Sequence, residues 1–154
     1  MGDQTVRAPT GVEIHPAQEQ HLPTLLQLWA SAAPVASPTD DLAALTQALH
    51  HPEAGLLVAE VDGEIVGSVM ACWDGWRGHL YRLVVAPGFR RRGIATALVR
   101  RGEALLEELG ARRVSVLVLA EGSGAAPFWE RCGYVRDPHV ERSVKMLRGV
   151  GLGL

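Results

Sequence analysis

The chain has 154 residues, of which 47% are hydrophobic and 21% are charged, and its formal net charge at pH 7 is −2. This length suits one domain with a substantial core, and a net charge near zero excludes a general attraction to nucleic acid or to acidic membranes. The basic residues are nevertheless concentrated, because six arginines fall between positions 82 and 101. A local positive region on a near-neutral chain favours a small anionic ligand over a polyanion.

The cysteines and the start of the chain bear on the compartment. Cys72 and Cys132 form neither a short metal-ligand spacing nor a C-x-x-C pair, and two cysteines are too few for a disulfide framework. Residues 1–11 lack the apolar core of a signal peptide, and no stretch approaches the roughly 20 apolar residues of a membrane span. We therefore expect a cytoplasmic protein without a membrane partner.

The first part of the chain predicts one short strand and two helices. Residues 1–11 are expected to form a flexible segment, and Val12–His15 has the pattern of a strand. Apolar residues then recur at helical spacing up to about Ala33, and two prolines end that helix. Asp40 is the expected N-cap of a second helix, which carries Leu42, Leu45 and Leu49 on one side.

The next part of the chain has the period of strands. Two apolar runs flank Asp62–Gly63 and predict a hairpin, because Asp–Gly readily takes the positive φ of a tight reversal. A second reversal at residues 74–78 leads into a strand at His79–Ala86, which Pro87–Gly88 ends. A long helix follows from Gly93 to about Leu109.

The last part predicts a strand at residues 112–120, a short helix at 123–131, a strand around Ser143–Leu147 and a flexible tail at 149–154. The order of elements is thus β-α-α-β-β-β-α-β-α-β, with no internal repeat and no linker long enough to divide the chain. This order indicates a mixed α/β sheet in one domain that spans residues 12–148.

The most informative segment is Leu83–Thr96, with the sequence LVVAPGFRRRGIAT. An apolar strand stops at Pro–Gly, three arginines follow, and Gly93 and Ala95 open a helix. The first turn of a helix exposes backbone N–H groups with a partial positive charge and is therefore an anion site. Small residues let a phosphate approach that backbone, and the arginines add charge-assisted hydrogen bonds. The segment predicts a phosphate-binding turn.

Three families use a turn of this kind. The P-loop needs G-x-x-x-x-G-K-[ST], but the segment has no lysine, and the dinucleotide fingerprint G-x-G-x-x-G is also absent. The remaining pattern, R-x-x-G-x-A at Arg90, Gly93 and Ala95, resembles the pyrophosphate loop of GNAT N-acetyltransferases. Downstream, the A-x-x-F-W-x-x-x-G-Y pattern at 125–134 resembles a second segment of that family, and the elements follow the family's order over about residues 12–148.

The resemblance implies a fold and a reaction. The fold would be α/β (α+β), with a mixed, mostly antiparallel central sheet, a splay between the strands that flank the loop, and helices on both faces. The reaction would be acetyl transfer from acetyl-CoA to a primary amine of a small molecule or a protein, without a metal and without a nucleic acid partner. The acceptor's identity stays open, as does the oligomeric state, for which a homodimer is one option.

The resemblance also implies which residues bind acetyl-CoA. Backbone groups of the strand before the loop would hold the pantetheine arm, and the Val85 N–H would bind the thioester carbonyl. Backbone N–H groups of the loop would hold the pyrophosphate and polarise the acetyl carbonyl. The expected cofactor-binding residues are Leu83, Val84, Val85, Arg90, Arg91, Arg92, Gly93, Ile94, Ala95 and Thr96.

The sequence departs from the family's pattern where proton transfer is concerned. Trp129 replaces a tyrosine that many members use as an acid, and an indole N–H cannot release a proton at neutral pH. Gly122 replaces a frequent asparagine, and Leu117 stands where some members have a glutamate base. The proton-transfer groups must therefore be sought elsewhere.

Candidates lie on the strand before the loop, where alternation places His79, Tyr81, Leu83 and Val85 on one face. His79 stands where histone-type members carry a glutamate base, and an imidazole can accept a proton near neutral pH. Tyr81 can pass a proton or position a water, so we expect both residues to be catalytic. Tyr134, which is more typical of a core position, and Glu121 are the alternatives.

Two other functions remain open. One is a sensor that binds acetyl-CoA without transferring the acetyl group, which Trp129 motivates; the other is a partner-binding domain without a cofactor. Trp29, Trp73 and Trp76 either line an acceptor pocket, where they would meet a cation, or are packing residues.

Overall fold

The computed structural model describes residues 7–32, 37–118 and 124–147. A five-stranded sheet of order β1-β2-β3-β4-β5 forms its centre. The strands are β1 (Glu13–Pro16), β2 (Ala54–Val61), β3 (Glu64–Trp73), β4 (Gly78–Val85) and β5 (Val114–Val116). The three neighbouring pairs from β1 to β4 are antiparallel, and β5 is parallel to β4. The prediction of a mixed, mostly antiparallel sheet is thus confirmed.

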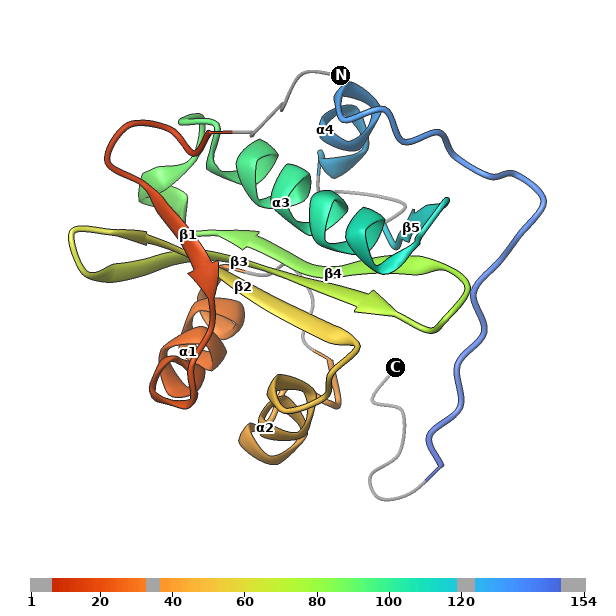
Figure 1. Cartoon of the computed structure of the whole chain (residues 1–154), viewed down its shortest axis with the longest axis horizontal. Helices are drawn as coiled ribbons and strands as arrows, with labels where there is room; N and C mark the ends of the chain where they lie inside the picture. The colour runs from red at the N-terminus through yellow and green to blue at the C-terminus, as the bar shows by residue number, and fades with distance from the viewer. Residues whose placement is uncertain (1–6, 33–36, 119–123, 148–154) are drawn as a thin grey trace.

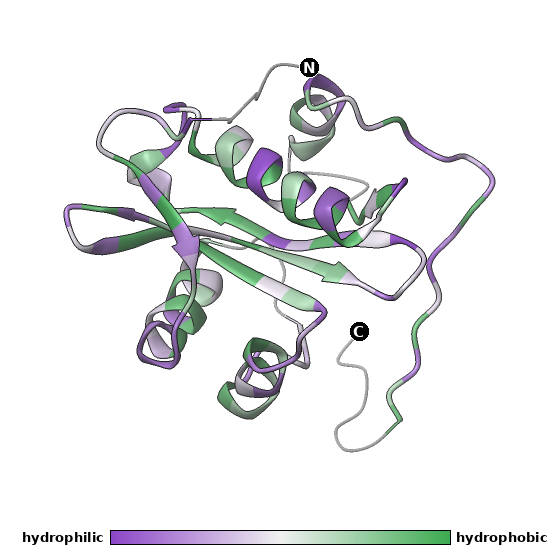
Figure 2. Ribbon diagram, viewed as in Figure 1, coloured by the Kyte–Doolittle hydropathy of each residue, from purple (hydrophilic) through white to green (hydrophobic). Residues whose placement is uncertain are grey.

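Helices cover both faces of the sheet, as the sequence predicts (Figure 1). The helices are α1 (Leu22–Ala32) and α2 (Leu42–Leu49) on one face, and α3 (Ile94–Leu109) and α4 (Ala125–Arg131) on the other. Two short 3-10 turns, η1 (Glu19–His21) and η2 (Pro87–Phe89), precede α1 and α3. Hydrophobic residues follow the central strands (Figure 2), because those strands are buried on both sides.

Each face has its own hydrophobic cluster. The cluster under α3 includes Leu80 and Val85 of β4, and the cluster under α1 includes Trp29, Val58 and Val84. Members of both clusters are nearly inaccessible to water, so each face contributes the burial energy expected of a packed core.

The cap of α2 differs from the prediction. Asp41, not Asp40, is the N-cap, and its side chain accepts a hydrogen bond from the Ala44 N–H at 2.8 Å. The Asp40 carboxylate is bound to Arg82 instead. Either aspartate fits a cap by type, so the choice was decided by a contact 42 residues away.

The C-terminal strands also differ from the prediction. β5 has three residues, whereas a strand at 112–120 was expected, of which residues 119–120 lie outside the described part of the chain. The predicted strand at Ser143–Leu147 is wrong for this structure, because residues 135–147 have no regular secondary structure. A strand forms only where its N–H and C=O groups meet those of a neighbour, and this segment has none beside it among the described residues.

A bulge in β4 changes which side chains face each side of the sheet. Ser68 of β3 lies opposite Val84, but Met70 lies opposite Tyr81, so β4 has one residue more than β3 between these pairs. Arg82 lies in this extra stretch and has a φ of 51°, in the left-handed region.

The prediction that four side chains of β4 share one face is wrong, because the bulge lies between them. These residues are His79, Tyr81, Leu83 and Val85. Leu83 and Val85 pack against the cluster under α3. His79 and Tyr81 alternate with Leu80, which also belongs to that cluster, so they point to the opposite face, where α1 and α2 lie. The extra residue shifts the alternation by one position along the strand.

β4 and β5 separate as the resemblance to the family implies. Their parallel pairing joins Gly78–Leu80 to Val114–Val116, whereas β4 continues to Val85 with β3 as its only neighbouring strand among the described residues. The edge of β4 that faces away from β3 is therefore open beyond Leu80, which confirms the expected splay between the strands that flank the loop.

Candidate active site

The loop after β4 ends in a helix start suited to an anion. Gly93 is the N-cap of α3 with a φ of 81°, a conformation that favours glycine. The Ala97 N–H donates to the Gly93 carbonyl at 3.1 Å and makes the first bond of the helix. The N–H groups of Ile94, Ala95 and Thr96 precede this bond and have no acceptor within the helix. Gly93 has no side chain that could cap them. These three donors form a site of partial positive charge.

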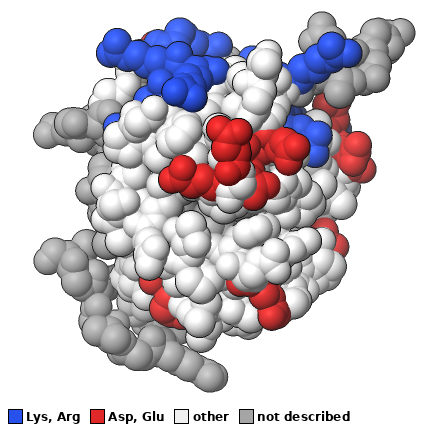
Figure 3. Space-filling model, turned by 90° about the vertical axis from the view of Figure 1, so that its left-hand side faces the viewer, with Lys and Arg blue, Asp and Glu red and all other residues white. Residues whose placement is uncertain are grey.

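The three arginines of the loop have different contacts. The Arg90 guanidinium donates from Nε to the Val85 carbonyl at 3.2 Å and from Nη2 to the Ala32 carbonyl at 3.4 Å, so it ties the loop to β4 and α1. The Arg92 guanidinium lies 5.1 Å from the centre of the Phe89 ring. Arg91 is exposed and has a φ of 62°. Figure 3 shows basic side chains gathered at this end of the molecule, above a separate acidic group.

His79 and Tyr81 are close together on the face of α1 and α2. Their rings are stacked with centroids 5.9 Å apart, and His79 Nε2 lies 3.4 Å from Asp74 Oδ2. Hydrogen bonds from the N–H groups of Arg77 and Trp76 lower the pKa of Asp74, so it is a carboxylate at neutral pH. The structure thus brings the two predicted catalytic residues together and adds a carboxylate that the sequence analysis did not single out.

The phenol of Tyr81 stays protonated over the physiological pH range. Burial is the largest cause that raises its pKa, and the charge of Arg142 opposes that rise. Tyr81 is also the first residue of β4 beyond the pairing with β5. A neutral hydroxyl that can donate a proton therefore lies at the point where the two strands separate.

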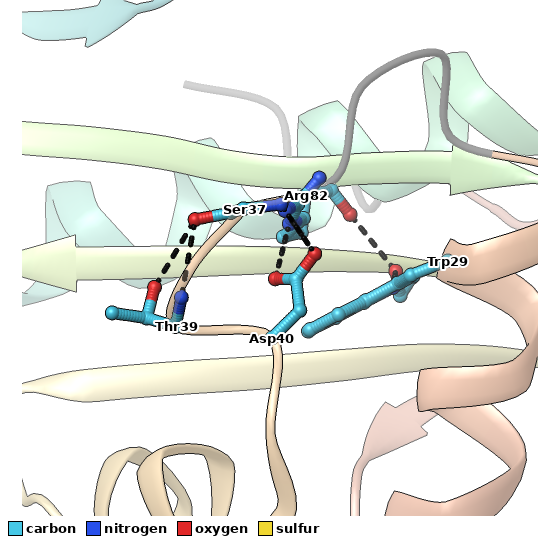
Figure 4. A network of polar contacts seen from close by, with 6 residues as sticks. Trp29, Ser37, Thr39, Asp40 and Arg82 are labelled. Carbon is cyan, nitrogen blue, oxygen red and sulfur yellow. Dashed lines mark hydrogen bonds and ion pairs between the residues drawn. The ribbon is translucent and has the colours of Figure 1, made fainter. Parts of the chain in front are cut away.

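A polar network joins the bulge of β4 to α1 and to the segment before α2 (Figure 4). Arg82 donates from Nε to Asp40 Oδ1 at 3.1 Å, and its Nη2 contacts Asp40 Oδ2. The side chains of Arg82 and Asp40 are 20% and 18% exposed, so the ion pair is largely screened from water. The Arg82 guanidinium also lies 5.3 Å from the centre of the Trp29 ring.

The backbone of the bulge belongs to the same network. The Ser68 hydroxyl, which is fully buried, donates to the Arg82 carbonyl at 2.8 Å and accepts from Trp29 Nε1 at 2.9 Å. Sequence reasoning missed Ser68, Asp40 and Arg82 as a group, since they come from separate segments. The one signal was an arginine inside the otherwise mostly apolar strand HLYRLVVA.

The remaining candidates lie on the α3 side or outside the described residues. The Tyr134 hydroxyl donates to Glu103 Oε2 at 3.0 Å, and its ring meets Trp129 edge-on at 5.0 Å, which fits a packing position. Burial and the Glu103 charge raise the pKa of Tyr134. Glu121 and Gly122 fall within residues 119–123 and are not described.

The three tryptophans considered for an acceptor pocket separate into different environments. Trp29 is buried beside Arg82, and Trp73 packs against the cluster under α3. Trp76 is 70% exposed, and the Arg77 guanidinium lies 3.9 Å from its ring centre. Trp29 is therefore the one of the three that contacts the bulge.

The described part of the chain also bears on metal sites, membrane helices and other pockets. Within residues 7–32, 37–118 and 124–147, no group of three or more His, Cys, Asp or Glu side chains could hold a metal ion. In the same ranges, none of the helices combines the length and the apolar character that a membrane crossing needs. A groove of about 570 Å³ lies away from the open end of β4, between β2, α2 and α3, and its lining includes Leu49, Gly55 and Leu105.

Comparison with known proteins points to one family. The model described as the acetyltransferase (GNAT) family matches residues 22–134. An acetyltransferase of Pectobacterium atrosepticum is 35% identical over 123 residues, which cover 80% of this chain and 87% of that protein.

Solved structures share the fold. An aminoglycoside N-acetyltransferase AAC(6')-Iy in complex with CoA has a TM-score of 0.74 at 22% identity, over 90% of this chain and 97% of that one. An aminoglycoside 6'-N-acetyltransferase of Acinetobacter haemolyticus has a TM-score of 0.73 at 21% identity, over 88% and 99%.

Proposed function

This chain belongs to the GNAT family and transfers an acetyl group from acetyl-CoA to an amine, and on that premise we propose which of its residues bind the cosubstrate and which serve the acceptor. The observation that carries the proposal is the course of β4. This strand leaves β5 just before Tyr81 and leads through the arginine loop to the anion-binding start of α3. Cosubstrate and acceptor would then meet at Tyr81.

The proposed cosubstrate site consists of the open edge of β4 and the start of α3. Backbone groups of Leu83, Val84 and Val85 would pair with the two amides of the pantetheine arm, as a neighbouring strand would. N–H groups of the segment from Arg91 to Thr96, which includes Gly93, Ile94 and Ala95, would hold the pyrophosphate.

The arginines would contribute in two ways. Arg91 and Arg92 would attract the phosphates by charge, and their exposure supports this role. Arg90 would act indirectly, because its side chain already binds the Val85 and Ala32 carbonyls and so fixes the loop. Its proposed part is to hold the loop in a shape that fits the phosphates.

The proposed acceptor site lies on the other face, at His79 and Tyr81. The amine nitrogen would attack the thioester carbonyl carbon, the carbon–sulfur bond would break, and the amine proton would pass to the His79 imidazole. Tyr81, whose raised pKa keeps it protonated, would give its proton to the departing thiolate. The Asp74 carboxylate, 3.4 Å from His79 Nε2, would stabilise the imidazolium that forms.

The charges on this face bear on the kind of acceptor. Among the described residues there, the Asp40 carboxylate is paired with Arg82 and the Asp74 carboxylate lies beside His79. Of these two carboxylates only Asp74 is not paired with an arginine, which matches an acceptor with one cationic group better than a polycation such as the aminoglycosides named for the structural neighbours. We therefore favour an acceptor with a single amine, on a small molecule or a protein, in the cytosol, where unpaired cysteines such as Cys72 and Cys132 are usual.

Thiol release tests the proposal. The purified chain is incubated with acetyl-CoA and a panel of monoamines, polyamines and peptides, and free CoA thiol is measured. We expect release that depends on an acceptor and is faster with monoamines than with polycations. Tight binding of acetyl-CoA with no acceptor-dependent release would contradict the proposal and support a sensor.

A further inference from the structure

The groove of about 570 Å³ that lies away from the open end of β4 follows the edge of β2. β1 pairs with β2 only between Leu57 and Glu60, so among the described residues no strand lies beside residues 54–56 on this side, and these residues line the groove. α2 lies on one side of the sheet and α3 on the other (Figure 1), and both contribute to the lining. A concave site of this volume fits a small ligand.

The middle of the groove is apolar. Leu49 of α2 lines it from one side, and Leu105 and Leu109 of α3 line it from the other. Leu109 is 41% exposed, and Leu49 and Leu105 are half-buried. Because Gly55 has no side chain, the Leu105 side chain occupies the space that a Cβ at Gly55 would need. The strand and these leucines therefore form a concave apolar surface, which an apolar ligand would remove from water.

Charges of opposite sign lie at the two ends of the groove. Arg101 and Glu108 of α3 both line it and are seven residues apart, so they stand on one stripe of the helix. Two helical turns separate them by about 10 Å. Glu53, a third charged lining residue, lies at the acidic end. The Trp73 N–H donates to the Glu53 carbonyl at 2.8 Å, and the Trp73 ring lies beside Gly110, the C-cap of α3.

These end charges are available to a ligand. Among the described residues, the side chains of Arg101, Glu108 and Glu53 have no hydrogen-bond or ion-pair partner. Arg100 also lines the groove but differs, because its guanidinium donates to Glu103 Oε1 at 3.0 Å. An unpaired arginine at one end and unpaired carboxylates at the other are complementary to a ligand that carries both charges.

We propose that the groove binds a short apolar peptide with free ends. The peptide carboxylate contacts Arg101, its apolar side chains pack on the leucines, and its ammonium group lies at Glu53 and Glu108. An extended peptide of three residues is about 10 Å long, which matches the separation of Arg101 and Glu108 along α3.

Ligands with charge of a single sign fit this groove less well. A fatty acid would leave both glutamates unpaired, and a polyamine would place an ammonium group beside Arg101. The groove is also separate from the face of β4 that carries His79. Gly55 lies opposite Ala71, and Ala71 lies opposite Leu80, so two strand spacings, about 10 Å, separate Gly55 from β4. Peptide binding in the groove therefore does not depend on the proposed acceptor chemistry.

An NMR titration with the peptide Ala-Leu-Ala, in the absence of acetyl-CoA, locates the site. We expect amide shifts at Gly55, Leu105 and Glu108, and none at His79 or Tyr81. Shifts confined to β4, which would identify the peptide as an acceptor alone, or no shifts at millimolar peptide would overturn the proposal.

Capped peptides test the two ends of the groove. Amidation of the C-terminus or acetylation of the N-terminus removes one charge and should weaken binding about threefold, as expected for an exposed ion pair. Arg101→Gln should bind the free and the amidated peptide equally. Arg112→Gln is the matched control, because Arg112 is exposed outside the groove, and it should keep the wild-type preference. Equal binding of both peptides by the wild type, or loss of the preference in both variants, would contradict the assigned ends.

Filling the groove tests its apolar middle. Ala104 is an exposed position of α3 that lines the groove, so Ala104→Trp should fold, keep the wild-type Tm and lose the peptide-dependent shifts. Glu107→Trp places the same side chain at an exposed position of α3 outside the groove and should bind normally. If both tryptophan variants bound Ala-Leu-Ala alike, the groove would not be the peptide site.

Discussion

The two ends of β4 present different kinds of group to a ligand. The end that leads into α3 presents backbone atoms, which are the open edge of the strand up to Val85 and the N–H groups that follow Gly93. At the other end, the groups are side chains, namely His79 and Tyr81 with Asp74 from the preceding turn. Arg82, at the bulge between the two ends, is held by Asp40 from the segment before α2.

This difference decides what each end tolerates. A site made of backbone atoms depends on φ and ψ, so it accepts changes of side chain but not of conformation. A site made of side chains depends on the identity of each residue and on the partners that hold its side chain in place. The following substitutions separate the two ends, in order of expected effect.

The largest effect is expected at the side-chain end. His79→Ala should lower turnover by about 10²-fold, the usual contribution of a general base, and leave acetyl-CoA affinity unchanged. Steady-state kinetics and calorimetry provide the two readings.

Tyr81→Phe is the parallel test, since it removes the hydroxyl and keeps the ring stacked on His79. Tyr134→Phe is its matched control, because that hydroxyl binds Glu103 on the opposite face and should not affect turnover. The raised pKa of Tyr81 means that its loss of a proton should not limit the rate below about pH 10. Full turnover in both His79→Ala and Tyr81→Phe would contradict the roles assigned to this end of β4.

The ion pair is expected to have the next largest effect. Asp40→Asn leaves the Arg82 guanidinium facing a neutral amide in a largely screened site, and it should lower the free energy of unfolding by about 2 kcal/mol. The KM for the acceptor should rise, while the Kd for acetyl-CoA should not change. Denaturant titration and kinetics measure these effects.

Asp41→Asn is the matched control for Asp40→Asn. Asparagine caps a helix about as well as aspartate, so stability and KM should both stay close to the wild type. If the two variants behaved alike, the ion pair would have no special role in holding the bulge.

A smaller effect is expected at the backbone end. Gly93→Val places a branched side chain at a φ of 81°, which costs about 1–2 kcal/mol and should weaken acetyl-CoA binding about tenfold. Gly88→Val is the control in the same loop, because no atom lies within 4 Å of its added Cβ and its φ is ordinary. Calorimetry should find normal affinity for Gly88→Val. If the two variants bound acetyl-CoA with equal affinity, the start of α3 would not be part of the cosubstrate site.

The smallest effect concerns charge. Arg91 and Arg92 are exposed, and screening acts over about 10 Å at 0.1 M salt, so added salt should weaken acetyl-CoA binding about threefold. Arg91→Ala combined with Arg92→Ala should lose most of this salt dependence. Salt dependence that persists in the double variant would assign the effect to other charges.

The backbone end was predictable from sequence, whereas much of the side-chain end was not. Pro–Gly, the arginines and Gly93 stand in one continuous segment, so local pattern was enough to predict the turn and the helix start, whereas the splay was predicted from the resemblance to the family. The bulge was not visible, because apolar residues continue on both sides of Arg82 and alternation alone cannot reveal one extra residue. The Asp40–Arg82 pair joins residues 42 positions apart and has no local signature.

The segment of residues 135–147 illustrates another limit. The pattern at Ser143–Leu147 has the period of a strand, but a strand also needs a partner, and the sequence does not say which segment provides it. A segment can therefore have the pattern of a strand and no regular secondary structure.

Hydrogen exchange with and without acetyl-CoA tests most directly whether β4 divides into a cosubstrate end and an acceptor end. Exchange at individual amides is followed by NMR. Acetyl-CoA should slow exchange at Leu83–Val85 and from Arg91 to Thr96, and leave α2 and the groove beside Gly55 unchanged. Protection at that groove with no change at the start of α3 would contradict the assignment of the cosubstrate to the backbone end of β4.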